Sequence, residues 1–227
     1  MRYSLPIIIA CFASTLNAAD FYTKAGISYV NPSTDGTIEK SLQTSTSLDS
    51  NYAPNVEIGY LFKLAESYRF SLGLAFSQLE TDASLNSSLT NVEAIDLNSL
   101  LDTTFVAGSI SAKEEYDIKN VTFILGYEWD VSERVYFNLS AGIGISKITQ
   151  TLKIINDGES LSSDDDDQVL TIPLGAGVGY SLTEQLSLEA NARYYFSGDT
   201  DFDHEVLSVK GGDADSIALG LSLRYLF

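Results

Sequence analysis

Cysteine, histidine, proline and long apolar runs are all scarce in this chain, and each shortage excludes a class of protein. The single cysteine, Cys11, lies near the N-terminus, so the rest of the chain has no disulfide, thiolate nucleophile or cysteine-ligated metal. No stretch approaches the ~18 apolar residues that a membrane-spanning helix needs. Proline occurs 4 times, whereas there are 16 glycines and 13 tyrosines. This composition favours strands over helices.

The N-terminal residues have the features of a secretory signal peptide. Arg2 supplies a positive charge, residues 5–12 are apolar, and the small residues Ala18 and Ala19 follow. Residues 8–11 also resemble a lipoprotein cleavage box ending in Cys11, but the apolar run before it is very short. We expect a signal peptide over residues 1–19 and one mature domain over residues 20–227.

Eight segments of the mature chain alternate between apolar and small or polar residues, as half-buried strands do. In each segment the apolar positions carry no charge. The segments cover residues 21–29, 56–62, 68–76, 121–129, 135–145, 170–180, 186–196 and 217–227.

The opposite face of these strands has a different composition. Its charged residues are Lys24, Glu57, Arg69, Glu128, Glu189, Arg193 and Arg224. Its glycines are Gly26, Gly59, Gly73, Gly126, Gly142, Gly144, Gly175, Gly177, Gly179 and Gly220. Segregation of glycine to one face indicates that this face is crowded by backbone, as in the interior of a narrow barrel.

A soluble barrel of the lipocalin type is the alternative, with the apolar face turned inward. Three features argue against it. Glycine on a solvated strand face weakens a sheet without a packing gain. The polar face is poor in charge, although a soluble exterior should be rich in it. Aromatic residues mark the ends of the apolar face, where a bilayer has its headgroup regions.

The connections alternate between short and long. Residues 63–67, 130–134 and 181–185 form short connections, each with an apolar residue, a small or hydroxyl residue and then Glu. The connections after the first, third, fifth and seventh strands are long and polar. Short periplasmic turns and long extracellular loops are the rule for outer-membrane barrels. An all-β, eight-stranded antiparallel up-and-down transmembrane barrel is therefore expected.

The last nine residues, Leu219-Gly220-Leu221-Ser222-Leu223-Arg224-Tyr225-Leu226-Phe227, resemble the C-terminal signal of outer-membrane barrels. Residues 59–62 and 126–129 are similar to segments of the small opacity-protein and OmpA-type barrels. The resemblance implies location in the bacterial outer membrane and contact with its lipid and lipopolysaccharide. It also implies that the barrel-assembly machinery reads Leu223, Tyr225 and Phe227 during insertion.

The inward charges have two interpretations. Four are positive and three are negative, and near-balance favours a paired network that plugs the lumen, because unpaired buried charge is costly. The same charges suit the filter of a narrow ion path. An interior of eight strands is just wide enough for side chains to fill, which favours the plug.

The long loops hold most of the acidic residues of a chain whose formal charge is -18. Residues 164–167 are four consecutive aspartates in the third loop, and Asp199, Asp201, Asp203, Glu205, Asp213 and Asp215 lie in the fourth. Their spacing suits oxygen ligation of calcium, but the pattern lacks the glycine and final glutamate of a calcium loop. A solvated surface, or loose cation bridging to lipopolysaccharide, is the simpler interpretation. A polyanionic surface disfavours nucleic acid.

Two further loop features have open interpretations. His204, with Ser208 four residues later, has the residue types of a lipid-A-modifying enzyme, but a loop gives a nucleophile and base little rigid support. Residues 92–101, in the second loop (residues 79–117), have the spacing of a short helix, which would pack on the rim or bind a partner.

The function expected from the sequence is a structural and surface-interaction protein, adhesin-like, with a plugged lumen and an extracellular ligand for its loops. A porin-like channel for ions or small solutes is the alternative, and an enzyme is the third class. No catalytic residue, cofactor or metal is expected.

Overall fold

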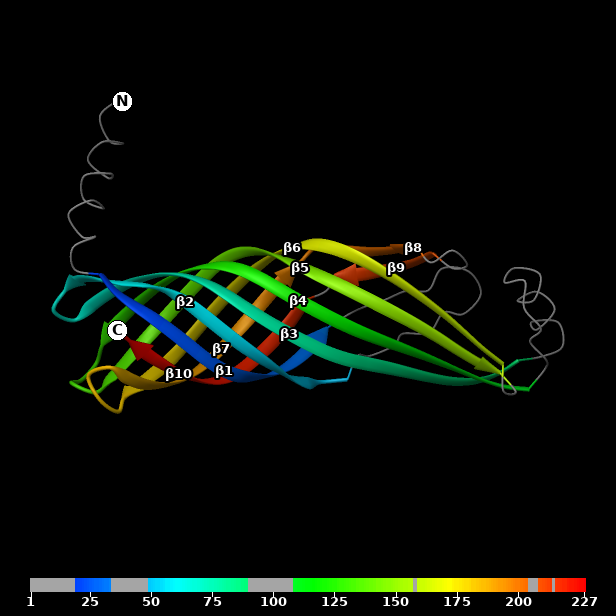
Figure 1. The fold of residues 1–227 in the computed structure, drawn as a ribbon, viewed down its shortest axis with the longest axis horizontal. Coiled ribbons are helices and arrows are strands. Elements are labelled where there is room, and N and C mark those ends of the chain that lie inside the picture. The colour runs from blue at the N-terminus through cyan, green and yellow to red at the C-terminus, as the bar shows by residue number, and fades with distance from the viewer. Residues whose placement is uncertain (1–18, 34–48, 90–107, 157–158, 204–207, 214) are drawn as a thin grey trace, which may run out of the picture.

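The computed structural model describes residues 19–33, 49–89, 108–156, 159–203, 208–213 and 215–227. Eight antiparallel strands form a closed barrel in the order β1-β10-β7-β6-β5-β4-β3-β2 (Figure 1). The strands are β1 (Ala19–Ser33), β2 (Asn51–Ala65), β3 (Tyr68–Leu89), β4 (Gly108–Asp130), β5 (Val135–Asn156), β6 (Glu159–Ser181), β7 (Leu186–Ser197) and β10 (Asp215–Leu226). The predicted fold class is confirmed.

The first and last strands close the ring. They pair from Tyr22 with Leu226 to Ser33 with Asp215. The backbone N–H of Phe227 donates to the carbonyl of Phe21 at 2.9 Å. Closure of this kind satisfies the backbone groups of both edge strands, which a sheet in lipid requires.

No helix of the described residues has both the length and the apolar character needed to cross a membrane.

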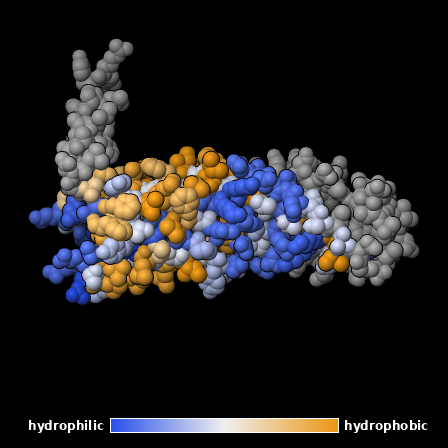
Figure 2. Space-filling model, in the orientation of Figure 1, coloured by the Kyte–Doolittle hydropathy of each residue, from blue (hydrophilic) through white to orange (hydrophobic). Residues whose placement is uncertain are grey.

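The two faces of the wall are those that the alternation predicts. Large apolar side chains of the outer face are exposed, with Leu219 at 56% and Ile143 at 54%. They form a band around the part of the barrel that carries the short turns (Figure 2). Rings contact one another along the turn end of this band, as in the pairs Phe21–Phe227 at 5.3 Å and Trp129–Phe137 at 5.7 Å between centroids. Phe62 is an exception, because it is packed between neighbouring rings and is only 7% exposed.

The short turns and the two ends of the barrel chain share one end of the molecule (Figure 1). The β4–β5 and β6–β7 turns have the same construction. In the first, the hydroxyl of Ser132 accepts from the N–H of Val135 at 3.1 Å; in the second, Thr183 accepts from Leu186 at 3.0 Å. The predicted repeat thus holds for these two turns, but not for the β2–β3 turn, where Leu64 still belongs to β2.

Four strands continue far beyond the barrel at the opposite end (Figure 1). β3, β4, β5 and β6 have 22 or 23 residues each, whereas β7 and β10 have 12. Their extensions, residues 78–89, 108–120, 146–156 and 159–169, pair in register and are called the outer sheet below.

The outer sheet corrects two expectations about the loops. Of the predicted second loop, residues 79–117, residues 79–89 and 108–117 are strand, and the rest lies outside the described residues. The aspartates at 164–167 lie on β6 and pair with residues 148–151 of β5, not in a loop. Backbone pairing continues because alternating side chains still separate an outer, charged face from an inner face that holds Leu79, Ile148 and Val169.

The fourth loop contains a separate hairpin, β8 (Asp199–Asp203) with β9 (Ser208–Asp213). Asp215, expected in this loop, is instead the first residue of β10 and accepts from the hydroxyl of Tyr194 at 2.6 Å. Residues 1–18, the expected helix at 92–101, His204 and Glu205 lie outside the described residues. So do the side chains of Asp199, Asp201, Asp203 and Asp213.

Candidate functional site: charged residues inside the barrel

All seven of the inward charges named above meet in the half of the barrel near the short turns. They come from β1, β2, β3, β4, β7 and β10, each at a position whose neighbours along the strand point outward. Glu57, Glu128, Glu189 and Arg224 are 5% exposed or less. The alternation of the strands therefore brings together residues as distant in the chain as Lys24 and Arg224.

The charges form a continuous series of ion pairs in which each carboxylate is shared. Glu57 lies 3.1 Å from the ammonium of Lys24 and 3.6 Å from Arg193. Glu189 lies 3.4 Å from Lys24 and 3.2 Å from the Nε of Arg224.

The series continues on the other side of Arg224. Its guanidinium donates to both oxygens of Glu128, a bidentate arrangement. Glu128 also lies 3.5 Å from the Nε of Arg69, and Arg69 pairs with Asp130 at the end of β4. Asp130, which the sequence assigns to a turn, adds a fourth negative charge, so the series contains equal numbers of both signs.

Two buried tyrosines complete the network. The hydroxyl of Tyr22 donates to Glu57 at 2.7 Å, and that of Tyr136 donates to Glu189 at 2.7 Å. The ring of Tyr136 also lies 4.7 Å from the guanidinium carbon of Arg224 and 4.9 Å from that of Arg69. Such contacts stabilise desolvated cations. Neither tyrosine is among the inward residues predicted from the sequence, although the alternation of β1 and β5 assigns both to the lumen.

Each of these rings lies over a glycine of the neighbouring strand. Tyr22 pairs with Gly59, and Tyr136 pairs with Gly179. A Cβ atom at Gly179 would lie 2.0 Å from the ring of Tyr136, so no larger residue fits beside this ring. The glycines on the inner face therefore make space for the side chains that close the lumen.

Inside the barrel, the described residues enclose two small cavities, of about 50 Å³ and about 20 Å³. Lys24, Glu57, Asn191 and Arg193 line both, so these four side chains form the partition between them. Each cavity has room for only a few water molecules.

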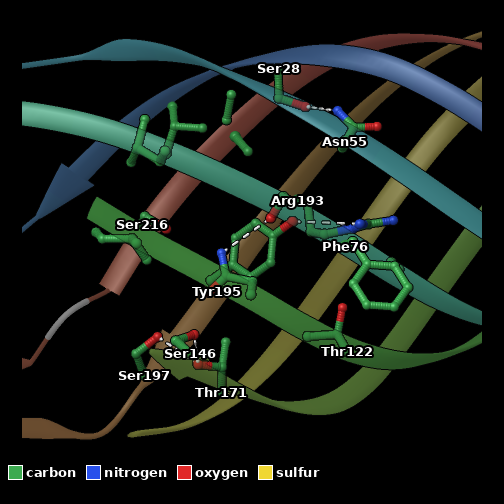
Figure 3. Close-up of a pocket in the computed structure, with 18 of the residues that line it drawn as sticks. Ser28, Asn55, Phe76, Thr122, Ser146, Thr171, Arg193, Tyr195, Ser197 and Ser216 are labelled. Atoms are coloured by element: carbon green, nitrogen blue, oxygen red, sulfur yellow. Dashed lines mark hydrogen bonds between the residues drawn. The ribbon is translucent and has the colours of Figure 1, made fainter. Parts of the chain in front are cut away.

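The larger cavity has walls of hydroxyl and amide groups (Figure 3). The amide of Asn55 donates to Ser28 at 3.0 Å, and Thr171 lies within hydrogen-bond distance of Ser197 at 3.2 Å. Towards the outer sheet the lining becomes apolar, and Val30, Ala53, Leu79 and Ala218 form a buried cluster. Along the axis the lumen thus passes from charged to hydroxylated to apolar side chains.

The residues of the expected assembly signal lie at the end of the barrel that carries the short turns, on the outer face of β10. Leu223, Tyr225 and Phe227 are 49%, 38% and 67% exposed. The structure brings them to the lipid-facing surface beside the turns, on the opposite face of the wall from the inward charges. Within the described residues, no group of histidine, cysteine, aspartate or glutamate side chains has the arrangement of a metal site.

The closed ring, the apolar exterior and the polar, filled lumen agree with one comparison of the whole sequence. The profile of the outer membrane protein beta-barrel domain matches residues 4–227. The chain belongs to this family. Its location is accordingly the bacterial outer membrane, where it contacts lipid and lipopolysaccharide. No curated protein sequence matches the chain.

Solved structures of outer-membrane proteins share the fold at low sequence identity. The outer membrane protease OmpT from Escherichia coli is 8% identical with a TM-score of 0.57, over 92% of this chain and 97% of that one. A major outer membrane protein from Thermus thermophilus is 13% identical with a TM-score of 0.50, over 92% and 99%. Neisserial surface protein A is 16% identical with a TM-score of 0.46, over 92% and 99%. At these identities the likeness concerns the fold alone.

Proposed function

We propose that this barrel is a structural anchor that presents the outer sheet as an interaction surface outside the cell, with a lumen closed by its charged network. The observation that carries the proposal is the outer sheet itself. Four strands keep their register well past the end of the apolar band, so a rigid surface extends away from the membrane (Figure 2). A barrel with a purely structural role needs no such extension.

The edges of the outer sheet support an interaction role. β7 pairs with β6 only from Thr171 onward, so the barrel partner of β6 ends there, although β8 also contacts β6. On the other side, the register of β2 with β3 ends at Ser77, but Asp49 and Asn51 still donate to the carbonyls of Asp82 and Glu80, so the contacts of this segment with β3 extend to Asp82. Strand edges are places where a further chain can add, and acidic residues such as those at 164–167 restrict which chains do so.

Adhesion is tested by shortening the outer sheet while the barrel is kept. The variant joins β3 to β4 after Ser77 and β5 to β6 after Ser146 with two-residue turns. Sedimentation of cells measures self-adhesion, and attachment to epithelial monolayers measures host adhesion. Cells with the full-length chain should aggregate or attach, and cells with equal surface amounts of the shortened barrel should not. Equal behaviour of the two in both assays would contradict the proposal.

A narrow channel is the second candidate, and the partition between the cavities favours it. A single layer formed by Lys24, Glu57, Asn191 and Arg193 separates the two cavities. Because Glu57, Glu128 and Glu189 each have two cationic partners, a cation that loses one carboxylate can be replaced there by the other cation. Single-channel recording in a planar bilayer distinguishes the candidates. A closed plug gives no conductance steps, provided that heat-modifiable gel mobility shows the protein to be folded. Reproducible conductance steps that are altered in Arg69 or Glu128 variants would establish a channel.

The proposal includes no catalytic role. A lipid-modifying reaction would depend on His204, so mass spectrometry of lipid A from cells with and without the protein tests it. A change in lipid A that disappears in the His204→Ala variant would contradict this part of the proposal. The role of Leu223, Tyr225 and Phe227 in assembly is likewise proposed, and Phe227→Ala should lower the folded amount in the membrane.

A further inference from the structure

The outer face of the outer sheet has charged residues arranged in rows across the four strands. The last apolar row consists of Phe76, Val121, Ile145 and Leu170, which are paired in register. The next row outward is Gln78, Lys119, Lys147 and Gln168. Its two lysines therefore lie directly opposite each other, immediately beyond the hydrocarbon-facing band.

Like charges directly opposite on neighbouring strands repel, because their Cβ atoms lie only about 5 Å apart. Lys119 and Lys147 are both well exposed, with 55% and 48% of their side chains accessible. Each has one acidic neighbour in the following row, Asp117 at 2.6 Å and Asp166 at 2.8 Å. An ammonium has three N–H donors, so these pairs occupy only part of the capacity of each lysine.

The position of this row coincides with the membrane boundary elsewhere on the barrel. At the outer ends of β1 and β2, the rings of Tyr29 and Tyr52 meet edge to face with centroids 5.7 Å apart, and those of Tyr194 and Phe196 lie 4.4 Å apart on β7. Aromatic side chains of this kind mark the headgroup level. On β4 and β5 the lysine pair comes directly after the last apolar residues. It thus occupies the level at which aromatic rings lie on the other side of the barrel.

We propose that Lys119 and Lys147 together bind a phosphate group carried by a lipid of the outer leaflet. A phosphate has several acceptor oxygens, so one group can bridge both ammonium ions and remove their mutual repulsion. The acyl chains of the same lipid would lie against Val121 and Ile145, directly below the lysines. Long lysine side chains at a membrane boundary reach the headgroups while their methylene groups remain on apolar surface. This inference rests on the outer-membrane location and is independent of the proposed adhesive role.

The outer sheet contains its own control for this proposal. Lys113 and Lys153 are also directly opposite each other on β4 and β5, and their side chains are 43% and 42% exposed. They lie six residues farther along the strand, about 20 Å from the first pair at the usual rise per residue. The two pairs have equal charge and equal cross-strand geometry but differ in their distance from the lipid.

The test compares the apparent thermal unfolding midpoint of the refolded mature protein in two kinds of vesicle, followed by heat-modifiable gel mobility. One kind contains phosphatidylcholine alone, and the other contains phosphatidylcholine with about one tenth lipid A, whose headgroup carries phosphates. A lipid that binds only the folded barrel raises the midpoint by mass action. We expect lipid A to raise it by about 2–4 °C, the shift that corresponds to roughly 1 kcal/mol for a chain of this size.

The double variant Lys119→Gln/Lys147→Gln should lose most of this increase, while Lys113→Gln/Lys153→Gln should keep it. Each variant is also measured in phosphatidylcholine alone, so that any change in the midpoint caused by its own lost ion pairs is subtracted from the lipid A effect. If both variants lose the lipid A effect equally, the effect is general electrostatic attraction and the proposal is overturned. The proposal is also overturned if the Lys119→Gln/Lys147→Gln variant keeps the effect. Inorganic phosphate added to phosphatidylcholine vesicles should give no increase. If it reproduces the lipid A effect, the site binds a free anion and the assignment to a lipid is wrong.

Discussion

At the scale of single residues, the lumen depends on pairs of one tyrosine and one glycine on neighbouring strands. Tyr136 fills the space that Gly179 leaves open, and it then reaches Glu189 with its hydroxyl and Arg69 and Arg224 with its ring. The hydrogen bond to Glu189 and the two cation–π contacts with Arg69 and Arg224 are thus possible only because Gly179 has no side-chain methyl group. The alternation in the sequence predicts that the glycines face inward, but it does not predict which side chain each glycine accommodates.

Gly179→Ala should destabilise the barrel, because the new Cβ atom overlaps the ring of Tyr136 and forces it away from Glu189. Overpacking of this kind costs about 1–3 kcal/mol. Urea unfolding in lipid vesicles, followed by the fluorescence of the single tryptophan Trp129, measures the loss. Gly198→Ala is the matched control, since a Cβ atom there has no neighbour within 4 Å. Equal stability of the two variants would mean that the ring can move without loss.

Arg224 is the residue on which the charge series depends most. It is 2% exposed and pairs with both Glu128 and Glu189, so its removal leaves two buried carboxylates with fewer partners. Arg224→Met should lower the free energy of unfolding by about 3–5 kcal/mol. In the same urea assay, adding Glu128→Gln should restore part of the loss, because it removes one uncompensated charge. No recovery in the double variant would indicate that packing, and not charge, accounts for the effect.

At the scale of elements, the sequence predicts the barrel strands well because lipid imposes a strict alternation on them. Ile143, Leu219 and Leu221 have to be apolar where Gly142 and Gly220 have to be small. The outer sheet was missed because water allows charged residues on a strand face, so the apolar signal ends at the membrane boundary. A charged alternation does persist, as in Lys113, Glu115, Asp117 and Lys119.

For the site, Asp130 and the two inward tyrosines show the same limit of prediction from the sequence. The parity of a strand indicates which way a side chain points, whereas the angle between strands decides which side chains meet across the lumen. Tyr136 and Glu189 are 53 residues apart, and their contact depends on the register of three strands.

Glu115 makes the outer sheet sensitive to acid. A hydrogen bond from Lys153, and then one from Lys113, lowers the pKa of this carboxyl below its ordinary value of 4.5. Because the folded pKa is depressed, the contribution of these pairs is present above the unfolded pKa and is lost as pH falls through the folded value. The outer sheet should therefore loosen below about pH 4 while the barrel stays closed.

A spin label at Thr151, which pairs with Glu115 across β4 and β5, measures this loosening. Its mobility should rise reversibly as the pH falls below about 4 and should stay low at pH 6. In Glu115→Gln the mobility should already be high at pH 6 and should change little with acid. An equal acid response in that variant would assign the transition to other carboxylates of the outer sheet.

At the scale of the whole molecule, closure of the lumen and extension of the outer sheet follow from the same arrangement of strands. The barrel end concentrates paired charges around cavities of about 50 Å³ and about 20 Å³, and β3 to β6 carry the wall outward without a break in register. A rigid outer surface is compatible with a sealed membrane only if the partition in the lumen holds. Lys24 is central to that partition, because it lines both cavities and pairs with two carboxylates.

Lys24→Ala should therefore convert the closed barrel into a leaky one. The change removes a side chain between cavities of about 50 Å³ and about 20 Å³, and it leaves Glu57 and Glu189 facing the enlarged space with less positive charge. Cation-selective steps should appear in planar bilayers where the unaltered protein gives none, and low pH should reduce them as the carboxylates are protonated. Lys63→Ala, on the exposed end of β2, should stay silent. Silence of the Lys24 variant as well would mean that the guanidinium groups stacked on Tyr136 seal the barrel independently, so that opening it requires the loss of Arg224 together with Lys24.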